Sequence, residues 1–213
     1  MKTSSVKTKS FLRRDEYAQL GKLSIDGEIL DVGGSKHSGY HELIGGTHTF
    51  IVGNIDDSYG LDVVFDAEEA WPFPDGKFAA VLVINLLEHL YRYQNAIRET
   101  YRVLRSDGRI VGVVPFVFNV HGCPHDYFRY TDTTIERMLR EQGFTDITIV
   151  PLGTGAGAVV YHALIGFARF YWMADVGIAL ARAFDGLIAR IKPDNRMSQK
   201  YMPLGYYFEA KKP

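Results

Sequence analysis

The sequence has little cysteine, little net charge and no long uninterrupted apolar run. Its single cysteine, Cys123, excludes a disulfide within the chain, which is typical of proteins from a reducing compartment. The formal net charge of -1 gives no overall field that would recruit nucleic acid. No apolar run follows the basic residues near the start, so this segment does not resemble a secretion signal. We therefore expect a cytoplasmic protein without a nucleic-acid partner.

The composition is that of one globular domain. Hydrophobic residues make up 46% of the chain and charged residues 23%, which excludes intrinsic disorder. A chain of 213 residues is long enough for one substantial core and short for two. Residues 1–26 are mostly polar and predict a tail and a short helix, so we expect the single domain to span residues 27–213.

From Gly27 onward, short apolar runs alternate with helical patterns. This alternation predicts an α/β fold with a doubly wound, Rossmann-like, mostly parallel sheet covered by helices on both faces. A final strand at Pro203–Lys212 completes seven. The other expected strands are Glu28–Val32, His48–Ile55, Asp62–Phe65, Phe78–Asn85, Arg109–Pro115 and Phe144–Val150.

Three helical regions accompany these strands. Apolar residues from Leu90 to Leu104 recur at helical spacing and predict a buried stripe. Thr133 and Glu136 have the spacing of a capping box, and Gly143 is a favourable end for the same helix. Residues 152–200 predict a helical insertion, apolar at 157–191, with two helices that break near residues 175–177. Its charged residues are too frequent for a membrane span.

Polar residues follow the expected strands where a parallel sheet binds ligands. Asp31, Asp56, Asp66 and Asn85 lie at or just beyond successive carboxyl ends, and they serve either a ligand or as solvated caps. The turn after the first strand, "GGSKHSG" at 33–39, lacks the G-x-G-x-x-G spacing of a dinucleotide site. A carboxylate near a ribose and another near an ammonium group describe S-adenosylmethionine better than a nicotinamide dinucleotide.

Several ordered motifs resemble those of class I S-adenosylmethionine-dependent methyltransferases, especially the small bacterial type 11-like family. The motifs are "ILDVGG", the run "NIDDSYGLDVVFDAEEAWPFPDGKFAAVLVINLLEHL", "ETYRVLRSDGRIVGVVPF" and "HGCPHDYFRYT". They cover about residues 28–150 in the family's order. Ser35 and His37 replace glycines that are common in the family's first motif, and Ser106-Asp107 replaces its usual Pro-Gly.

The resemblance implies a set of cofactor-binding residues. Asp31 and Gly33 would hold the amino-acid end of the cofactor, with Gly34 lining the turn, and Asp56 would take the ribose hydroxyls. The remaining implied contacts are Asp66 and Ala67 at the adenine edge, and Asn85 and Leu86 beside the sulfonium.

The block "HGCPHDYFRYT" gathers acid–base residues beyond the fifth strand. A hydroxyl acceptor needs a base, so we predict that His121 or His125 acts as general base, oriented by Asp126. The alternative is a structural turn in which Asp126 pairs with Arg129 and the aromatic residues pack. A metal site is not expected here, because Pro124 disfavours the helix that would bring the two histidines together. The predicted substrate-binding residues are Tyr127, Arg129 and Tyr130.

We predict O-methylation of a small hydroxylated or sugar-like acceptor, a preference that comes from the family resemblance. The alternative is a catalytically silent subunit that binds S-adenosylmethionine and supports a partner. The late helices predict a lid, a homodimer surface, or an aromatic surface with Phe167, Phe170, Tyr171 and Trp172 that contacts a membrane or a lipid-linked substrate.

Overall fold

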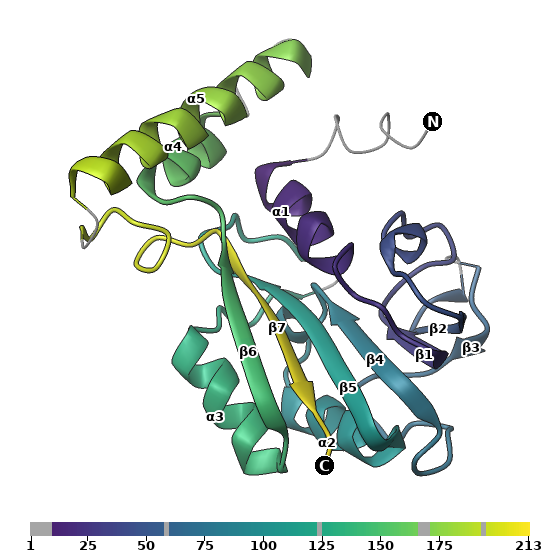
Figure 1. Cartoon of the computed structure of the whole chain (residues 1–213). Coiled ribbons are helices and arrows are strands. Elements are labelled where there is room, and N and C mark those ends of the chain that lie inside the picture. Colours follow the sequence, from purple (N-terminus) through teal and green to yellow (C-terminus); the bar gives the residue numbers. More distant parts are fainter. Residues whose placement is uncertain (1–9, 58–59, 123–124, 166–170, 193–194) are drawn as a thin grey trace.

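The computed structural model describes residues 10–57, 60–122, 125–165, 171–192 and 195–213. Its seven-stranded sheet has the order β3-β2-β1-β4-β5-β7-β6, and β7 runs antiparallel to both of its neighbours (Figure 1). This arrangement confirms the predicted fold class. The strands are β1 Gly27–Val32, β2 His48–Asn54, β3 Val63–Val64, β4 Phe78–Ile84, β5 Leu104–Pro115, β6 Thr145–Leu152 and β7 Gly205–Lys211.

The strands lie close to their predicted positions, with one marked difference in β5. This strand begins at Leu104 and not at Arg109, because Leu104 pairs with Phe78 of β4 before the register shifts. Between Leu104 and Arg109, Asp107 has the left-handed conformation with φ 63° that glycine adopts most readily. Its N–H donates to the Lys212 carbonyl, so the segment that reads as a turn stays attached to the sheet.

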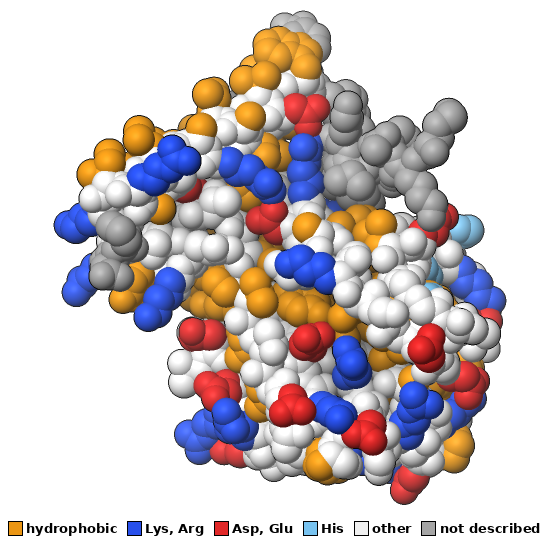
Figure 2. Space-filling model, in the orientation of Figure 1, with side chains coloured by type: hydrophobic (Ala, Val, Ile, Leu, Met, Phe, Trp, Pro, Cys, Tyr) orange, Lys and Arg blue, Asp and Glu red, His pale blue; other side chains and the backbone are white. Residues whose placement is uncertain are grey.

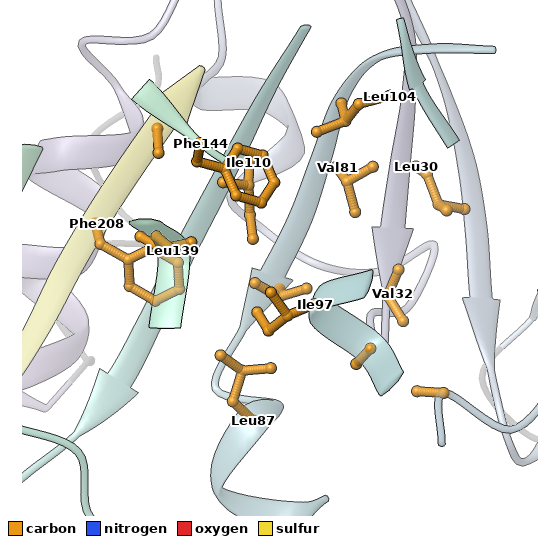
Figure 3. Packing of buried hydrophobic residues seen from close by; sticks show 14 of the residues in the cluster. Leu30, Val32, Val81, Leu87, Ile97, Leu104, Ile110, Leu139, Phe144 and Phe208 are labelled. Atoms are coloured by element: carbon orange, nitrogen blue, oxygen red, sulfur yellow. The ribbon is translucent and has the colours of Figure 1, made fainter. Parts of the chain in front are cut away.

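Helices cover both faces of the sheet and divide the core in two. One cluster packs α2 and α3 against Leu30, Val81 and Ile110 (Figure 3). The other packs α1 and α4 against the opposite face, where Leu82 and Val111 are 0% exposed. The helices are α1 Phe11–Leu20, α2 Tyr93–Val103, α3 Asp132–Gln142, α4 Ala156–Leu164 and α5 Tyr171–Ile191, with 3-10 helices η1 His41–Leu43 and η3 Leu87–His89.

Helix α1 is part of this core, although the sequence placed it ahead of the domain. Phe11 and Leu20 are both 0% exposed and belong to the cluster on the sheet. Ser10 caps the helix, because its hydroxyl accepts a hydrogen bond from the Arg13 N–H. Packing of this apolar face therefore determines where α1 lies.

Two details of the predicted helices are wrong. The N-cap of α3 is Thr131, whose hydroxyl accepts from the Thr134 N–H, and not Thr133. Gly143 ends the helix in the left-handed conformation as predicted. Residues 175–177 lie inside α5 and do not separate two helices. Asp175 pairs with Arg14 of α1, and this tertiary contact holds the residue where the sequence predicted the helix to end.

The connection from β1 to β2 contains no α-helix. Residues 33–47, all of them described, contain only the single 3-10 turn η1. A parallel crossover is usually built on an α-helix, whose N-terminus can bind an anion. Here the glycine turn runs into an irregular loop, so any ligand at this turn meets side chains and loop backbone in place of a helix terminus.

The α4–α5 insertion begins at the carboxyl edge of the sheet. Leu152 at the end of β6 and Pro115 at the end of β5 are both register partners of Gly205, the first residue of β7. The insertion therefore leaves and returns on the side where the parallel strands end, and Figure 1 shows it beyond the end of β6. Among the described residues, no helix has the length and apolar character needed to span a bilayer.

Candidate functional site

The glycine turn is built around a completely buried carboxylate. Asp31 is 0% exposed, and its oxygens accept hydrogen bonds from the Tyr40 hydroxyl at 3.0 and 2.8 Å. The His41 Nε2 lies 2.7 Å from Asp31 Oδ2, and the imidazole stacks on Phe50. Burial, followed by the nearby charge of Asp31, raises the pKa of Tyr40 well above its usual value. An ammonium group near this turn would meet a carboxylate that is already fixed by two side chains.

The two glycines are required by contacts inside the protein. A Cβ at Gly34 would lie 2.0 Å from Asp31 Oδ2, and a Cβ at Gly33 would lie 2.7 Å from Leu86 Cδ1. Gly33 also has a φ of 77°, which side chains rarely adopt. The turn therefore closes over Asp31 on one side and Leu86 on the other.

Ser35 and His37 do not need to be glycine in this turn. Neither residue has a positive φ, and the Ser35 hydroxyl accepts a hydrogen bond from the His37 N–H at 3.1 Å. Lys36 forms an ion pair of 2.6 Å with Asp62, which ties the turn to the segment before β3. These departures from the family's first motif are thus compatible with an ordered turn.

At the tip of β2, the strand ends in an amide and an exposed acid follows. Asn54 donates to the Gly34 carbonyl at 3.1 Å, so β2 is tied directly to the glycine turn. Asp56, predicted to bind the ribose, is exposed two residues beyond the strand. Because Val32 and Gly53 are register partners, this tip lies beside the turn, as the predicted role requires.

The residues predicted at the adenine edge form a compact turn after β3. The Asp66 Oδ1 accepts from the Glu68 N–H at 2.8 Å, and Ala67 is buried at 8% exposure. The Ala67 carbonyl accepts from the Trp71 indole N–H. This turn is therefore rigid, and Asp66 remains half-buried at its surface.

Asn85 follows β4 directly and has a left-handed conformation with φ 50°, a geometry that asparagine tolerates better than most residues. Its Nδ2 donates to Glu16 Oε2 at 3.0 Å. Glu16 is only 1% exposed and was missed by sequence reasoning, which treated its segment as a tail. The missed signal was its position on the apolar stripe of α1, between Leu12 and Leu20 at helical spacing.

Glu88 is the least satisfied carboxylate of the site. It is 0% exposed, and neither of its oxygens has a hydrogen-bond partner among the described residues. Burial raises the pKa of Glu88 to about 8; the charge of Arg129 opposes this shift, and the negative charges of Asp126 and Glu16 add to it. The His89 Nε2 lies 3.8 Å from Glu88 Oε1. A buried acid with this pKa is typical of functional sites.

The block after β5 folds against η3. Asp126 receives two hydrogen bonds from Arg129, at 2.5 and 2.7 Å, and the guanidinium holds the pKa of Asp126 well below its usual range. The backbone N–H of His121 donates to Asp126 Oδ2 at 2.8 Å, and the ring nitrogen Nδ1 of His121 lies 3.4 Å from the same oxygen. The Asp126–Arg129 pair of the structural alternative is therefore present, and Asp126 also lies against His121.

The other residues of the block differ in their exposure. Tyr130 is 3% exposed and its hydroxyl donates to the Leu87 carbonyl, while Arg129 is occupied by Asp126 and two carbonyls. Tyr127 is 44% exposed and is the best placed of the three predicted substrate residues. His125 is exposed, and its carbonyl lies 2.6 Å from His89 Nδ1. Cys123 and Pro124 lie outside the described residues.

Solved structures share this architecture. A possible histamine N-methyltransferase from Thermotoga maritima superposes with a TM-score of 0.61 at 13% identity, covering 98% of this chain and 92% of that one. A methyltransferase from Archaeoglobus fulgidus gives 0.58 at 19% identity, with 94% and 91% covered. Phosphoethanolamine N-methyltransferase 2 from Haemonchus contortus gives 0.55 at 17% identity, covering 92% of this chain; the chain spans 50% of that protein.

The sequence itself adds a match to a family model. Residues 52–112, from within β2 to within β5, match the model described as a methyltransferase domain. The chain therefore has the fold of these methyltransferases and contains a segment that matches a methyltransferase domain model. No curated protein matches the chain in a sequence search.

The charge of the candidate site fits S-adenosylmethionine. S-adenosylmethionine brings a sulfonium and an ammonium, and its sulfonium supplies the methyl group when bound. Glu16, Asp31 and Glu88 are each at most 1% exposed. Asp31 lies near the end of β1, Glu88 follows β4, and Glu16 accepts from Asn85 at the tip of β4. Acids buried together in this way favour a cationic ligand. The glycine turn, Asn85 and Leu86 would border that ligand, as the sequence predicts.

Proposed function

We propose that this protein transfers the methyl group of S-adenosylmethionine to an oxygen of a small hydroxylated or sugar-like acceptor. Transfer from a sulfonium is an in-line displacement, so the protein mainly has to align the two reactants. An alcohol acceptor also needs to lose its proton, which calls for a base within hydrogen-bond reach.

One observation carries this proposal: an imidazole with a defined tautomer beside a buried acid. The Nδ1 of His121 lies 3.1 Å from the Asn119 carbonyl and 3.4 Å from Asp126. Both neighbours only accept hydrogen bonds, so Nδ1 carries the proton and Nε2 presents its lone pair. The His121 side chain is 40% exposed and is therefore accessible to an acceptor. His125 is the second candidate for the base, with Tyr127 beside it to contact the acceptor.

The insertion supports a role in acceptor binding. Phe118 contacts both His121 and His162 of α4, with ring centroids 5.1 and 4.7 Å apart. Helix α4 thus packs on the loop that carries the proposed base. We propose that α4 forms one wall of the acceptor site, which is the lid role predicted for this segment.

The outer face of α5 supports docking to an anionic membrane surface. Both acids of the helix are engaged: Asp175 pairs with Arg14, and the buried Asp185 accepts from the Gly157 and Ala158 N–H groups. The open face is apolar. Arg182 is paired with Asp15, so the exposed basic residues are Arg190 and Lys192 at the C-terminal end of α5, where they could meet anionic lipids. Figure 2 shows hydrophobic side chains along this outer edge. The exposed large residues are Trp172, Met173, Val176, Leu180, Phe184, Leu187 and Ile191. Phe167 and Phe170 lie outside the described residues.

The test is a pair of measurements on the same preparation. Calorimetry with S-adenosylhomocysteine should show one bound molecule per chain. Incubation with methyl-labelled S-adenosylmethionine and fractionated extract should label a hydroxylated product. Binding without transfer to any fraction would favour a catalytically silent subunit, and absence of binding would refute the proposal.

A further inference from the structure

Three side chains at the carboxyl edge form a cluster. The proposed methyl transfer uses one of them as a base and does not explain why the three lie together. Glu88, His89 and His121 each place one potential ligand atom within 4.8 Å of the others. Glu88 and His89 belong to η3 after β4, and His121 belongs to the loop after β5. Two neighbouring strands therefore bring the three groups together.

The hydrogen bonds of both histidines leave Nε2 unprotonated, with a lone pair that can bind a metal. The His89 Nδ1 lies 2.6 Å from the His125 carbonyl, and a carbonyl can only accept, so Nδ1 is the donor. The same reasoning places the His121 proton on Nδ1, facing Asn119 and Asp126. A backbone carbonyl or carboxylate behind Nδ1 is the usual support of a histidine that ligates a metal through Nε2.

The carboxylate of Glu88 is a second, independent indication that this cluster binds a ligand. Glu88 is 0% exposed, and both oxygens lack a hydrogen-bond partner among the described residues. A buried carboxylate is normally hydrogen-bonded or bound to a metal, because its desolvation is otherwise uncompensated. The nearest cation-forming group is His89, whose Nε2 is 3.8 Å away from Oε1.

We propose that Glu88, His89 and His121 bind one divalent transition-metal ion of the zinc type. Two imidazoles and one carboxylate form a ligand set that suits zinc and leave a further coordination position open. With metal–ligand bonds of about 2.0–2.2 Å, tetrahedral ligand atoms lie about 3.4 Å apart, close to the 3.8 Å found between Glu88 and His89. The 40% exposure of the His121 side chain leaves the open position accessible from solvent.

The proposed ion also refines the acceptor site, a step that depends on the proposed function. The cluster lies next to the glycine turn, since Leu86, two residues before Glu88, contacts Gly33. An acceptor hydroxyl bound at the open position would have a lowered pKa and would release its proton to His125 or to water. His121 would then be a metal ligand, and the base role would fall to His125.

The test titrates the whole chain, freed of any polyhistidine tag and of metal by EDTA, with ZnCl2 in a calorimeter. The parent should bind one Zn²⁺, and Co²⁺ should give the visible absorption of a low-coordinate site, whereas Mg²⁺ and Ca²⁺ should not bind. Glu88→Gln and His121→Gln should each weaken Zn²⁺ binding by about tenfold or more. His48→Gln is the control, because His48 begins β2 at the opposite end of that strand from the site.

The outcomes separate this site from the proposed methyl transfer. Circular dichroism confirms that each variant is folded, and S-adenosylhomocysteine binding is measured on the same samples. Cofactor binding without Zn²⁺ binding would overturn the metal site alone. Equal Zn²⁺ affinity in the parent, the Glu88→Gln variant and the His121→Gln variant would also overturn it. Zn²⁺ binding without cofactor binding would refute the proposed function and leave the metal site standing.

Discussion

The Asn85 Nδ2 amide donates to Glu16 Oε2 over 3.0 Å and so joins α1 to the tip of β4. Glu16 also receives a hydrogen bond of 2.8 Å from Arg13 on its other oxygen. Helix α1 thereby places a buried carboxylate against the end of β4. Helix α1 is consequently a component of the site as well as of the core.

Removing the main anchor of α1 should lower stability and loosen the site. Phe11 is 0% exposed, packs near Tyr161 and lies under the Arg182 guanidinium. Phe11→Ala should reduce the free energy of unfolding by about 3 kcal/mol, measured by urea denaturation. Gln19→Ala, at a more exposed position of the same helix, should change it by less than about 0.5 kcal/mol. Equal effects would show that α1 does not contribute to the core.

A methyl group at Gly34 should disrupt the turn. The added Cβ would meet Asp31 Oδ2 at 2.0 Å, and Asp31 is fixed by Tyr40 and His41. Gly34→Ala should therefore abolish binding of S-adenosylhomocysteine in calorimetry. Gly186→Ala is the matched control: nothing lies within 4 Å of its added Cβ inside α5, so stability should rise by about 0.5–1 kcal/mol with binding unchanged.

Cofactor binding and turnover should separate at two positions. Asp56→Ala should lose affinity for S-adenosylhomocysteine, because the predicted ribose acceptor is removed. His125→Ala should keep that affinity and slow methyl transfer to the labelled product identified in extract. Parent-like binding and turnover in both variants would show that neither residue has its predicted role.

Acidification should weaken the attachment of α4. Burial lowers the pKa of His162, and its Nε2 has no hydrogen-bond partner among the described side chains. Since the folded pKa is below the unfolded one, this contribution is present above about pH 6.5 and is lost as the pH falls through the folded value.

The measurement for His162 is limited proteolysis of α4 between pH 7.5 and pH 5. The parent should be cleaved faster at the lower pH, and His162→Phe should lose most of that difference. His37→Phe, at an exposed position, should behave like the parent. An unchanged pH dependence in His162→Phe would assign the effect to another group.

The outer face of α5 should control membrane association. Leu180 and Leu187 are 65% and 55% exposed on the same face. The double variant Leu180→Glu, Leu187→Glu should lose co-sedimentation with phosphatidylglycerol vesicles, whereas Val64→Glu on β3 should not. A parent that ignores these vesicles but forms a dimer in light scattering, with the double variant monomeric, would reassign the face to a second copy of the chain.

The sequence predicts the sheet well because each strand is determined by local alternation of apolar runs and turns. It predicts α5 poorly because Asp175 and Gly177 look unfavourable for a helix until their partners are known. Asp175 pairs with Arg14, and the Tyr161 ring lies where a Cβ of Gly177 would come within 2.7 Å. Both reasons are tertiary contacts, which a local pattern does not contain.

The candidate site shows the same division. Asp31 lies near the end of β1, Asn85 follows β4, and the His121 block lies in the loop after β5, so their positions could be derived from the order of motifs. The positions of Glu16 and Tyr40 could not be derived in this way. Glu16 comes from a segment whose polar composition predicts a tail. The role of Tyr40 becomes visible only in the structure, where its hydroxyl donates to the buried Asp31.

The pairing of Leu152 with Gly205 means that the segment between them enters and leaves the sheet through neighbouring backbone positions. A replacement segment of different length could be joined at the same two points without altering any strand register. Such chimaeras would keep the sheet, but they would also need new partners for Phe11 and Arg14 of α1, which now contact Tyr161 and Asp175 of the insertion.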